Sequence, residues 1–231
     1  MIRFEHVTKY YTDDDRSVED ASFSIHAGEF VSIVGHSGAG KTTLIKLLLG
    51  EIKPTAGNIW FDDFDVDALK SSELPNYRRR IGVVFQDFRL LNNRTAFENV
   101  AFAMEAAGKS DDDIIADVPH ALELVGLSHK ARSFPEEMSG GERQRLAIAR
   151  AIINQPEVIL ADEPTGNLDP DSTKDVVEIL KKINDLGTTV ILTTHNKGIV
   201  DSLGKRVITL EKGRIIKDVA NGRYHHHESA E

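Results

Sequence analysis

The predicted fold is decided by the stretch Phe30-Val31-Ser32-Ile33-Val34-Gly35-His36-Ser37-Gly38-Ala39-Gly40-Lys41-Thr42. Its opening residues form a nearly continuous apolar run, which is typical of a strand that is covered on both faces. A glycine-rich turn follows, and the residues from Thr42 to Leu49 then have a helical pattern that stops at Gly50. We therefore predict a buried strand that passes through a tight turn into a helix.

The same alternation of strand and helix continues along most of the chain. Further apolar runs lie at 81–85, 158–161, 190–193 and 206–210, and helical patterns lie at 142–154 and 172–186. Near the N-terminus, residues 2–7 and 21–25 instead alternate apolar and polar side chains, as half-buried strands do. Buried strands that alternate with helices indicate a mainly parallel α/β sheet.

A different pattern occupies the middle of the chain, from about residue 87 to residue 137. Its apolar residues recur at helical spacing, in one group from Phe97 to Met104 and in another from Ile114 to Val125. We interpret this stretch as a helical insert in the α/β core and not as a separate domain. No internal repeat is visible, so we expect one domain over residues 1–231, with a flexible tail from about 221 to 231.

The turn after the first buried strand fits the pattern G-x-x-x-x-G-K-[ST] of phosphate-binding loops. In such a loop the backbone N–H groups close around phosphate oxygens, and the helix N-terminus adds partial positive charge. Lys41 is expected to reach the β- and γ-phosphates, and the Thr42 hydroxyl to bind Mg²⁺. An ordinary turn would explain the glycines but not Lys41 and Thr42 in register. We expect nucleotide contacts from Gly35, His36, Ser37, Gly38, Ala39, Gly40, Lys41, Thr42 and Thr43.

Two acidic residues end another apolar run, Val158-Ile159-Leu160-Ala161-Asp162-Glu163. A carboxylate at the carboxyl end of a parallel strand lies beside the ligand crevice of such a sheet. Asp162 is therefore placed to hold Mg²⁺, and Glu163 to take a proton from an attacking water. Alone, the pair would be better explained as acids that solvate the turn at Pro164, but a phosphate-binding loop in the same chain favours the magnesium site.

Further motifs in matching order resemble those of the ATP-binding cassette ATPases, over about Ile2 to Gly213. The family's Q-loop and switch histidine are matched by Gln86 and His195. Its D-loop is matched by Asn167-Leu168-Asp169, and its signature motif by Ser139-Gly140-Gly141-Glu142-Arg143-Gln144. Ser139 and Glu142 also form a capping box, and the residues alone favour a purely structural cap as much as a functional one.

This resemblance implies an α/β phosphate-loop NTPase of the ABC type, with a mainly parallel core, an antiparallel β subdomain and a helical subdomain insert. It implies an ATPase that uses ATP and Mg²⁺ and forms a homodimer when ATP is bound, each ATP facing the signature motif of the other subunit. The implied catalytic residues are Lys41, Gln86, Glu163 and His195, and the implied metal ligands are Thr42, Gln86 and Asp162. Further nucleotide contacts are implied for Tyr11, Ser139, Gly140, Gly141 and Asp169.

The stacking residue for adenine is a choice between two neighbouring tyrosines. Tyr10 and Tyr11 follow one another on a predicted strand, so one of them must face away. Tyr11 is favoured by its place after Val7-Thr8-Lys9 in the family pattern, the alternative being a half-buried edge tyrosine. His195 has its own alternative, a core histidine with its hydrogen bonds satisfied.

Within the family, His36 and Asp87 favour a cell-division ATPase, which works with an integral membrane protein to control cell-wall hydrolysis. We therefore expect a cytoplasmic subunit that is peripheral on the inner face of the cell membrane through that partner. The alternatives are the ATPase of a lipoprotein-release or small-molecule transporter, and a nucleotide-gated scaffold with little turnover. The large apolar residues just after Gln86 are more than a short insert buries, which predicts a partner-docking groove at Phe88, Leu90, Leu91, Phe97 and Phe102.

The composition excludes several other classes of protein. The chain has 231 residues, no cysteine and a formal net charge of −9, so disulfides and thiolate metal sites are excluded and we expect no nucleic-acid partner. No apolar run approaches the ~18–20 residues of a membrane span, and the N-terminus lacks the layout of a signal peptide. We interpret the tail histidines 225–227 as a solvated end, since three histidines alone make a poor metal cage.

Overall fold

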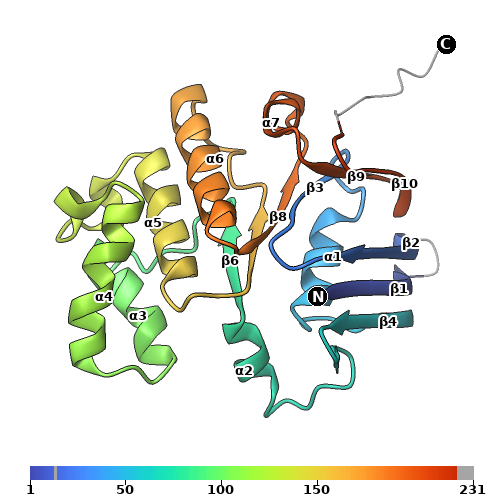
Figure 1. Ribbon diagram of the computed structural model, residues 1–231, viewed down its shortest axis with the longest axis horizontal. Coiled ribbons are helices and arrows are strands. Elements are labelled where there is room, and N and C mark those ends of the chain that lie inside the picture. The colour runs from blue at the N-terminus through green and yellow to red at the C-terminus, as the bar shows by residue number, and fades with distance from the viewer. Residues whose placement is uncertain (13–14, 223–231) are drawn as a thin grey trace. The chain divides into compact units, whose positions relative to one another are not determined.

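The computed structural model describes residues 1–12 and 15–222, in two compact units (Figure 1). The first unit comprises Met1–Ser71 and Ile191–Glu231, and the second comprises Ser72–Val190. Most of the tail predicted from about residue 221, including the three histidines, lies outside the described residues. The expectation of one domain over residues 1–231 stays a prediction.

The first unit contains a four-stranded sheet with the order β2-β1-β4-β5. Its strands are β1 (Ile2–Thr12), β2 (Asp15–Ile25), β4 (Ala56–Phe61) and β5 (Phe64–Asp65), and β1 pairs antiparallel with β2 and β4, as β4 does with β5. Phe4 and Phe23 stack in its core, with ring centroids 4.5 Å apart. The antiparallel β subdomain is thereby confirmed.

Both long strands of this sheet extend further than their alternation predicts. The register between β1 and β2 shifts repeatedly from Phe4 onward, and His6 and Asp20 have left-handed backbone with φ of 51° and 50°. A bulge inserts a residue and reverses which side chains face the core, so a period of two is lost although pairing continues. Trp60 of β4 donates from its indole N–H to Glu5 at 2.9 Å, and the Arg3 guanidinium lies 5.5 Å from its ring centroid.

The strand that decides the fold is β3 (Phe30–Val34), and all of its residues are buried. It pairs in parallel with β9 (Arg206–Glu211), which pairs antiparallel with β10 (Arg214–Val219). The helices of this unit are α1 (Lys41–Leu48) and α7 (Lys197–Leu203), and β8 (Thr189–Thr194) lies at the boundary between the units. The apolar runs at 30–34, 190–193 and 206–210 are therefore strands, as predicted.

The second unit combines a parallel strand pair with helices. β6 (Ile81–Phe85) and β7 (Val158–Asp162) pair in parallel, with Phe85 opposite Asp162. Helix α2 (Leu74–Arg79) precedes β6. A Cβ atom on Gly82 would lie 2.4 Å from the carbonyl oxygen of Ala151, so helix α5 (Gly140–Ile152) packs closely on β6.

The predicted helical insert is confirmed as α3 (Ala96–Ala106), α4 (Asp111–Leu124) and two short 3-10 turns at Ser128–Lys130 and Pro135–Glu137. Helices α3, α4 and α5 pack together (Figure 1), and each begins with a complete capping box. Pro119 does not end α4, which continues to Leu124. The unit closes with α6 (Pro170–Asp185). In the described part of the chain, we find no helix with the length and apolarity needed to cross a bilayer.

Candidate functional site

The phosphate loop follows β3 and is held in place by close backbone contacts. Gly40 has φ of 107°, and a Cβ atom there would lie 2.2 Å from the carbonyl oxygen of Ser17. A Cβ atom on Gly35 would lie 2.5 Å from the carbonyl oxygen of Leu210. The Gly213 N–H also donates to the Ala39 carbonyl at 3.1 Å. Only glycine fits at positions 35 and 40, so these two residues are required by the shape of the loop.

Lys41 begins α1 and lies inside the loop, with 7% of its surface exposed. Its ammonium donates to the carbonyl of Gly35 at 2.8 Å and to that of His36 at 3.1 Å. Thr42 beside it is exposed, whereas Thr43 is buried. A buried cation beside the first N–H groups of a helix is the arrangement that binds a phosphate anion.

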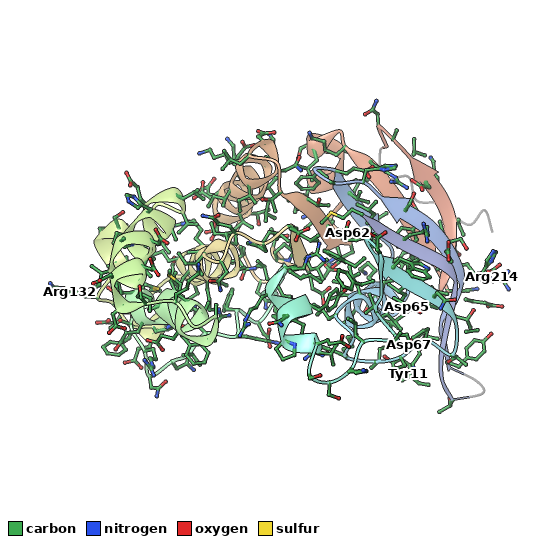
Figure 2. All side chains as sticks on the ribbon, turned by 60° about the horizontal axis from the view of Figure 1, so that its bottom comes forward. Tyr11, Asp62, Asp65, Asp67, Arg132 and Arg214 are labelled. Carbon is green, nitrogen blue, oxygen red and sulfur yellow. The ribbon has the colours of Figure 1, made fainter. Side chains whose placement is uncertain are left out.

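The first unit also holds the predicted adenine-stacking tyrosine and the predicted switch histidine. Tyr11 is 47% exposed near the end of β1, and the Lys9 ammonium lies 5.6 Å from its ring centroid. Figure 2 labels Tyr11 on the outside of this unit, where an aromatic base can stack on it. His195 is exposed and directly follows β8, so it is no core histidine. Asn196 caps α7, accepting from the Ile199 N–H at 3.3 Å.

In the second unit, the two predicted acids lie at the end of β7. The residues from Val158 to Ala161 are fully buried, while Asp162 and Glu163 are half-buried. Glu163 has φ of 48°, and its carbonyl accepts from the Gly166 N–H at 3.1 Å in a tight turn. A left-handed glutamate is uncommon and strained, and such strain concentrates at functional sites.

Gln86 is exposed just after β6, and its side chain is engaged by the loop that leads to α6. Its amide nitrogen donates to the Asn167 side-chain oxygen at 3.2 Å. A Cβ atom on Gly166 would lie 2.8 Å from the same nitrogen, so the glutamine amide lies directly over Gly166. The structure therefore brings the predicted Q-loop residue together with the predicted D-loop.

The signature motif begins α5 as a capping box. The Ser139 N–H donates to the Glu142 carboxylate at 2.8 Å, and the Glu142 N–H donates to the Ser139 hydroxyl at 3.2 Å. The bond from the Ser139 backbone is the main cause that holds the pKa of Glu142 below its ordinary value. The structural role foreseen for Ser139 and Glu142 is thereby confirmed, and it leaves a nucleotide contact open.

The two signature glycines have different surroundings. A Cβ atom on Gly141 would lie 2.3 Å from the Ser172 hydroxyl, whereas one on Gly140 would meet nothing closer than 3.5 Å. Asp169 caps α6 and accepts from the Ser172 hydroxyl at 2.6 Å and from the Ser172 N–H at 2.9 Å. These bonds lower the pKa of Asp169. The signature motif and the D-loop are thus packed against one another within the second unit.

Three polar residues to which the sequence analysis assigned no individual role hold the chain at the end of β6 and after it. Arg150 donates to the carbonyls of Phe88 and Arg89, at 3.0 and 2.6 Å. Gln144 donates to the Phe85 carbonyl at 3.2 Å, and the Asn99 amide bonds the chain from Leu91 to Thr95. Gln144 and Asn99 are both fully buried. A polar residue on an otherwise apolar helix face is the signal that would have indicated them.

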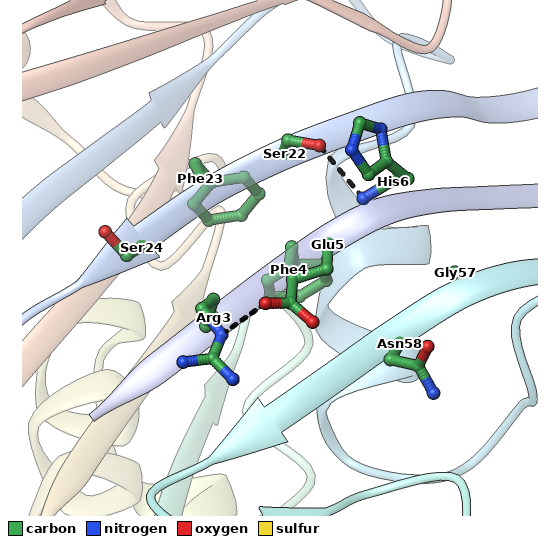
Figure 3. A pocket seen from close by; sticks show the side chains of 9 residues that line it. All are labelled: Arg3, Phe4, Glu5, His6, Ser22, Phe23, Ser24, Gly57 and Asn58. Carbon is green, nitrogen blue, oxygen red and sulfur yellow. Dashed lines mark hydrogen bonds and ion pairs between the residues drawn. The ribbon is translucent and has the colours of Figure 1, made fainter.

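A separate hollow of about 510 Å³ lies on the antiparallel sheet of the first unit (Figure 3). Its lining contains none of the predicted site residues. An ion pair of 2.7 Å joins Arg3 and Glu5 there, and the His6 N–H donates to the Ser22 hydroxyl at 2.9 Å. The hollow therefore adds nothing to the predicted nucleotide site.

No cluster of three or more metal-binding histidine, aspartate or glutamate side chains occurs among residues 1–12 and 15–222. Mg²⁺ keeps several waters and is commonly held by one or two protein groups together with substrate phosphates. The exposed Thr42 hydroxyl and the half-buried Asp162 carboxylate are donors of the right chemistry.

Comparison with known proteins gives one consistent result. A family model described as ABC transporter matches residues 18–166. The cell division ATP-binding protein FtsE of Bacillus subtilis is 51% identical, over 97% of this chain and 98% of its own. FtsE of Mycobacterium tuberculosis is 49% identical, with the same coverage of 97% and 98%. A dimeric post-hydrolysis state of an ATP-binding cassette with ADP and Pi is 34% identical, covering 97% of this chain and all of that one, with a TM-score of 0.86.

Proposed function

Because the chain belongs to the ABC transporter family, we propose that it is the ATP-hydrolysing subunit of a cell-division complex. Its fold is the α/β phosphate-loop NTPase fold of that family, and it is an ATPase that uses ATP and Mg²⁺. The role in cell division is supported by FtsE relatives at about half identity over nearly the full chain.

The observation that carries this proposal is the phosphate loop with its buried lysine. Gly35 and Gly40 bring the backbone to distances that no other residue allows, and the Lys41 ammonium lies within the resulting concavity. The loop is thereby preorganised for an anion before the nucleotide arrives. Tyr11 supplies an exposed ring for the adenine.

Hydrolysis needs charge neutralisation and a positioned water more than covalent chemistry. Lys41 neutralises charge on the β- and γ-phosphates, and Thr42, Gln86 and Asp162 would hold Mg²⁺, which would supply further neutralisation of the phosphate charge when bound. Glu163 accepts a proton from the attacking water, and His195 helps to prepare that water for attack. The half-burial of Glu163 and the exposure of His195 at a strand end support these roles.

The active form in this proposal is a homodimer that closes when ATP is bound. Ser139, Gly140 and Gly141 then present the N-terminus of α5 to the γ-phosphate in the other subunit, beside Asp169. The dimeric state of the similar cassette with ADP and Pi supports this arrangement. Because Ser139 already caps α5, its contact to phosphate comes from the hydroxyl proton and the helix N–H groups.

The partner in this proposal is an integral membrane protein resembling FtsX, which holds the chain at the inner face of the cell membrane. Its docking surface comprises Phe88, Leu90, Leu91 and Phe97, which are half-buried, and Phe102, which is exposed, all in the second unit. Introducing a charge into this apolar surface costs desolvation free energy when the partner covers it. The Phe88→Asp and Leu91→Asp variants are therefore expected to lose the partner in a pull-down from detergent-solubilised membranes.

Ile115→Asp serves as the control for that experiment, since Ile115 is 66% exposed on α4 and outside the docking surface. It should recover as much partner as the wild type does. Full recovery by folded Phe88→Asp and Leu91→Asp proteins would place the docking surface elsewhere. The identity of the recovered protein decides between a cell-division partner and a permease with many spans.

The ATPase itself is tested by phosphate release in the presence of the partner. Steady turnover of at least ~1 s⁻¹ in the partner complex is expected for an enzyme of this class. A complex that binds Mg-ATP but stays below single turnover would instead make the chain a nucleotide-gated scaffold.

A further inference from the structure

The chain directly after Gln86 adopts an unusual backbone. Phe88 and Arg89 both lie in the left-handed region, with φ of 59° and 49°. L-residues with a Cβ atom rarely take this conformation, and consecutive ones are rarer because each costs free energy. Such a segment persists only where its surroundings hold it in place.

Arg150 on α5 fixes this segment by hydrogen bonds to its backbone. Its guanidinium donates to the Arg89 carbonyl at 2.6 Å and to the Phe88 carbonyl at 3.0 Å, so one side chain bonds both strained residues. Burial lowers the pKa of Arg150, which indicates that these contacts form in a partly dehydrated place. The flanks of the segment are fixed independently, by Gln144 at the Phe85 carbonyl and by Asn99 at Leu91.

We propose that Arg150 is a positioning residue, which holds the left-handed pair Phe88–Arg89 and thereby keeps Gln86 oriented for hydrolysis. The planar fork of a guanidinium matches two adjacent carbonyls, whereas the ammonium of lysine is a single point of charge. Without this fork the pair would relax toward ordinary backbone, and Gln86 lies only two residues from it. Arg150 lies on α5, and Ser139 caps the N-terminus of the same helix, so α5 connects this segment to the signature motif. The proposal rests on the catalytic role proposed for Gln86.

The test compares Arg150→Met and Arg150→Lys with the wild type and with Arg145→Met. Arg145 lies on the same helix and pairs with Asp175 at 3.2 Å, so it serves as the matched control. For Arg150→Met, we expect kcat to fall about 10- to 100-fold because of misplaced catalytic geometry, while the Kd for ATP stays within about twofold because the phosphate loop is untouched. Arg150→Lys should give an intermediate kcat and Arg145→Met a normal one.

Hydrogen exchange measures the positioning itself and does not depend on activity. The amides of residues 86–91 should exchange at least about 10-fold faster in Arg150→Met, because hydrogen bonds to a charged group are lost. Adding Arg89→Gly to Arg150→Met should recover part of kcat and part of the protection, since glycine takes a positive φ without strain. A rescue of this kind is not expected if Arg150 merely fills space.

The outcomes separate this inference from the proposed function. If a folded Arg150→Met protein has the same kcat and the same hydrogen exchange as the wild type, the positioning role alone would be overturned. Failure of Arg89→Gly to recover either property would overturn the action through left-handed backbone. If the wild-type complex hydrolyses no ATP, the proposed function fails, whereas faster exchange in Arg150→Met and Arg150→Lys would still support the hold on residues 88 and 89.

Discussion

The phosphate loop and the segment after Gln86 both depend on left-handed backbone, but they obtain it by different means. In the phosphate loop the left-handed residues are glycines, Gly38 and Gly40, with φ of 79° and 107°. In the second segment they are Phe88 and Arg89, which have side chains and are held by Arg150. One region accepts this backbone without strain, and the other needs an external contact to maintain it.

This difference in backbone should affect ATP binding and ATP hydrolysis differently. A loop whose shape is inherent in its glycines is ready for a phosphate at all times. A segment that depends on a side chain from another element changes whenever that element moves. Binding of ATP is therefore expected to be robust to changes in the second unit, while hydrolysis is expected to be sensitive to them.

The largest expected effect sharpens this separation and comes from Glu163→Gln. The change keeps the shape of the side chain but removes the proposed base, so kcat should fall about 100- to 10,000-fold. ATP binding by the phosphate loop should survive, and unhydrolysed ATP should hold two subunits together, because it contacts both of them only in the dimer. Light scattering with and without Mg-ATP measures the shift from monomer to dimer. A variant that stays monomeric at saturating ATP would contradict the proposed dimer.

The converse change is Lys41→Ala, which removes the buried cation from the phosphate loop. A charge-assisted hydrogen bond is worth about 1.5–3 kcal/mol, so the Kd for ATP should rise about 10- to 100-fold. Calorimetric titration checks this value, with Glu163→Gln as the variant that keeps binding. Equal ATP affinity in Lys41→Ala and wild type would remove Lys41 from the phosphate site and break the comparison.

The two signature glycines offer a smaller and more local test. Gly141→Ala should destabilise the fold by about 1–3 kcal/mol, because the new Cβ atom overpacks against Ser172. Gly140→Ala, with open space around it, should stabilise α5 by about 0.5–1 kcal/mol through its better helix propensity. Urea unfolding of both variants gives the two values. Equal effects would mean that the contact with Ser172 carries no strain.

The smallest effect concerns the pH dependence of stability through Asp169. Its pKa is lowered in the folded state by the Ser172 hydrogen bonds, so its contribution is present above the ordinary carboxyl value of ~4. That contribution is lost as the pH falls through the lower folded value. The stability difference between wild type and Asp169→Ala should therefore shrink on acidification. Asp169→Asn retains an acceptor for the cap but has no carboxyl group to titrate. Its cap should therefore contribute the same stability across this pH range.

Much of this molecule could be predicted because its signals are local in the sequence. The apolar runs, the phosphate loop and the capping box of Ser139 and Glu142 each span only a few residues. The structure has them where the sequence pattern predicted. β10 was missed because its residues are mostly exposed, and it is tied to β9 by Arg206 and Asp218 at 2.6 Å. No periodicity signals a strand of that kind.

The contacts that position the catalytic segments could not be predicted in the same way. Arg150 is 61 and 62 positions from the carbonyls that it bonds, and Asn167 is 81 positions from Gln86. Such pairs depend on how α5 packs on β6 and on the turn after Glu163, which are properties of the folded chain. The roles of Gln86, Glu163 and His195 in hydrolysis remain predictions that the variants above address.

Trp60 is an intrinsic fluorescence probe of the first unit. It is the only tryptophan, and it lies in β4 of the first unit, bonded to Glu5. Its fluorescence therefore follows the melting of the antiparallel sheet, whereas far-ultraviolet circular dichroism is dominated by the helices of the second unit. Coincident denaturation curves from the two signals would mean that both units melt in one cooperative transition. Separate midpoints would make each unit a folding unit of its own, with the nucleotide-binding loop and the hydrolysis segments differing in stability.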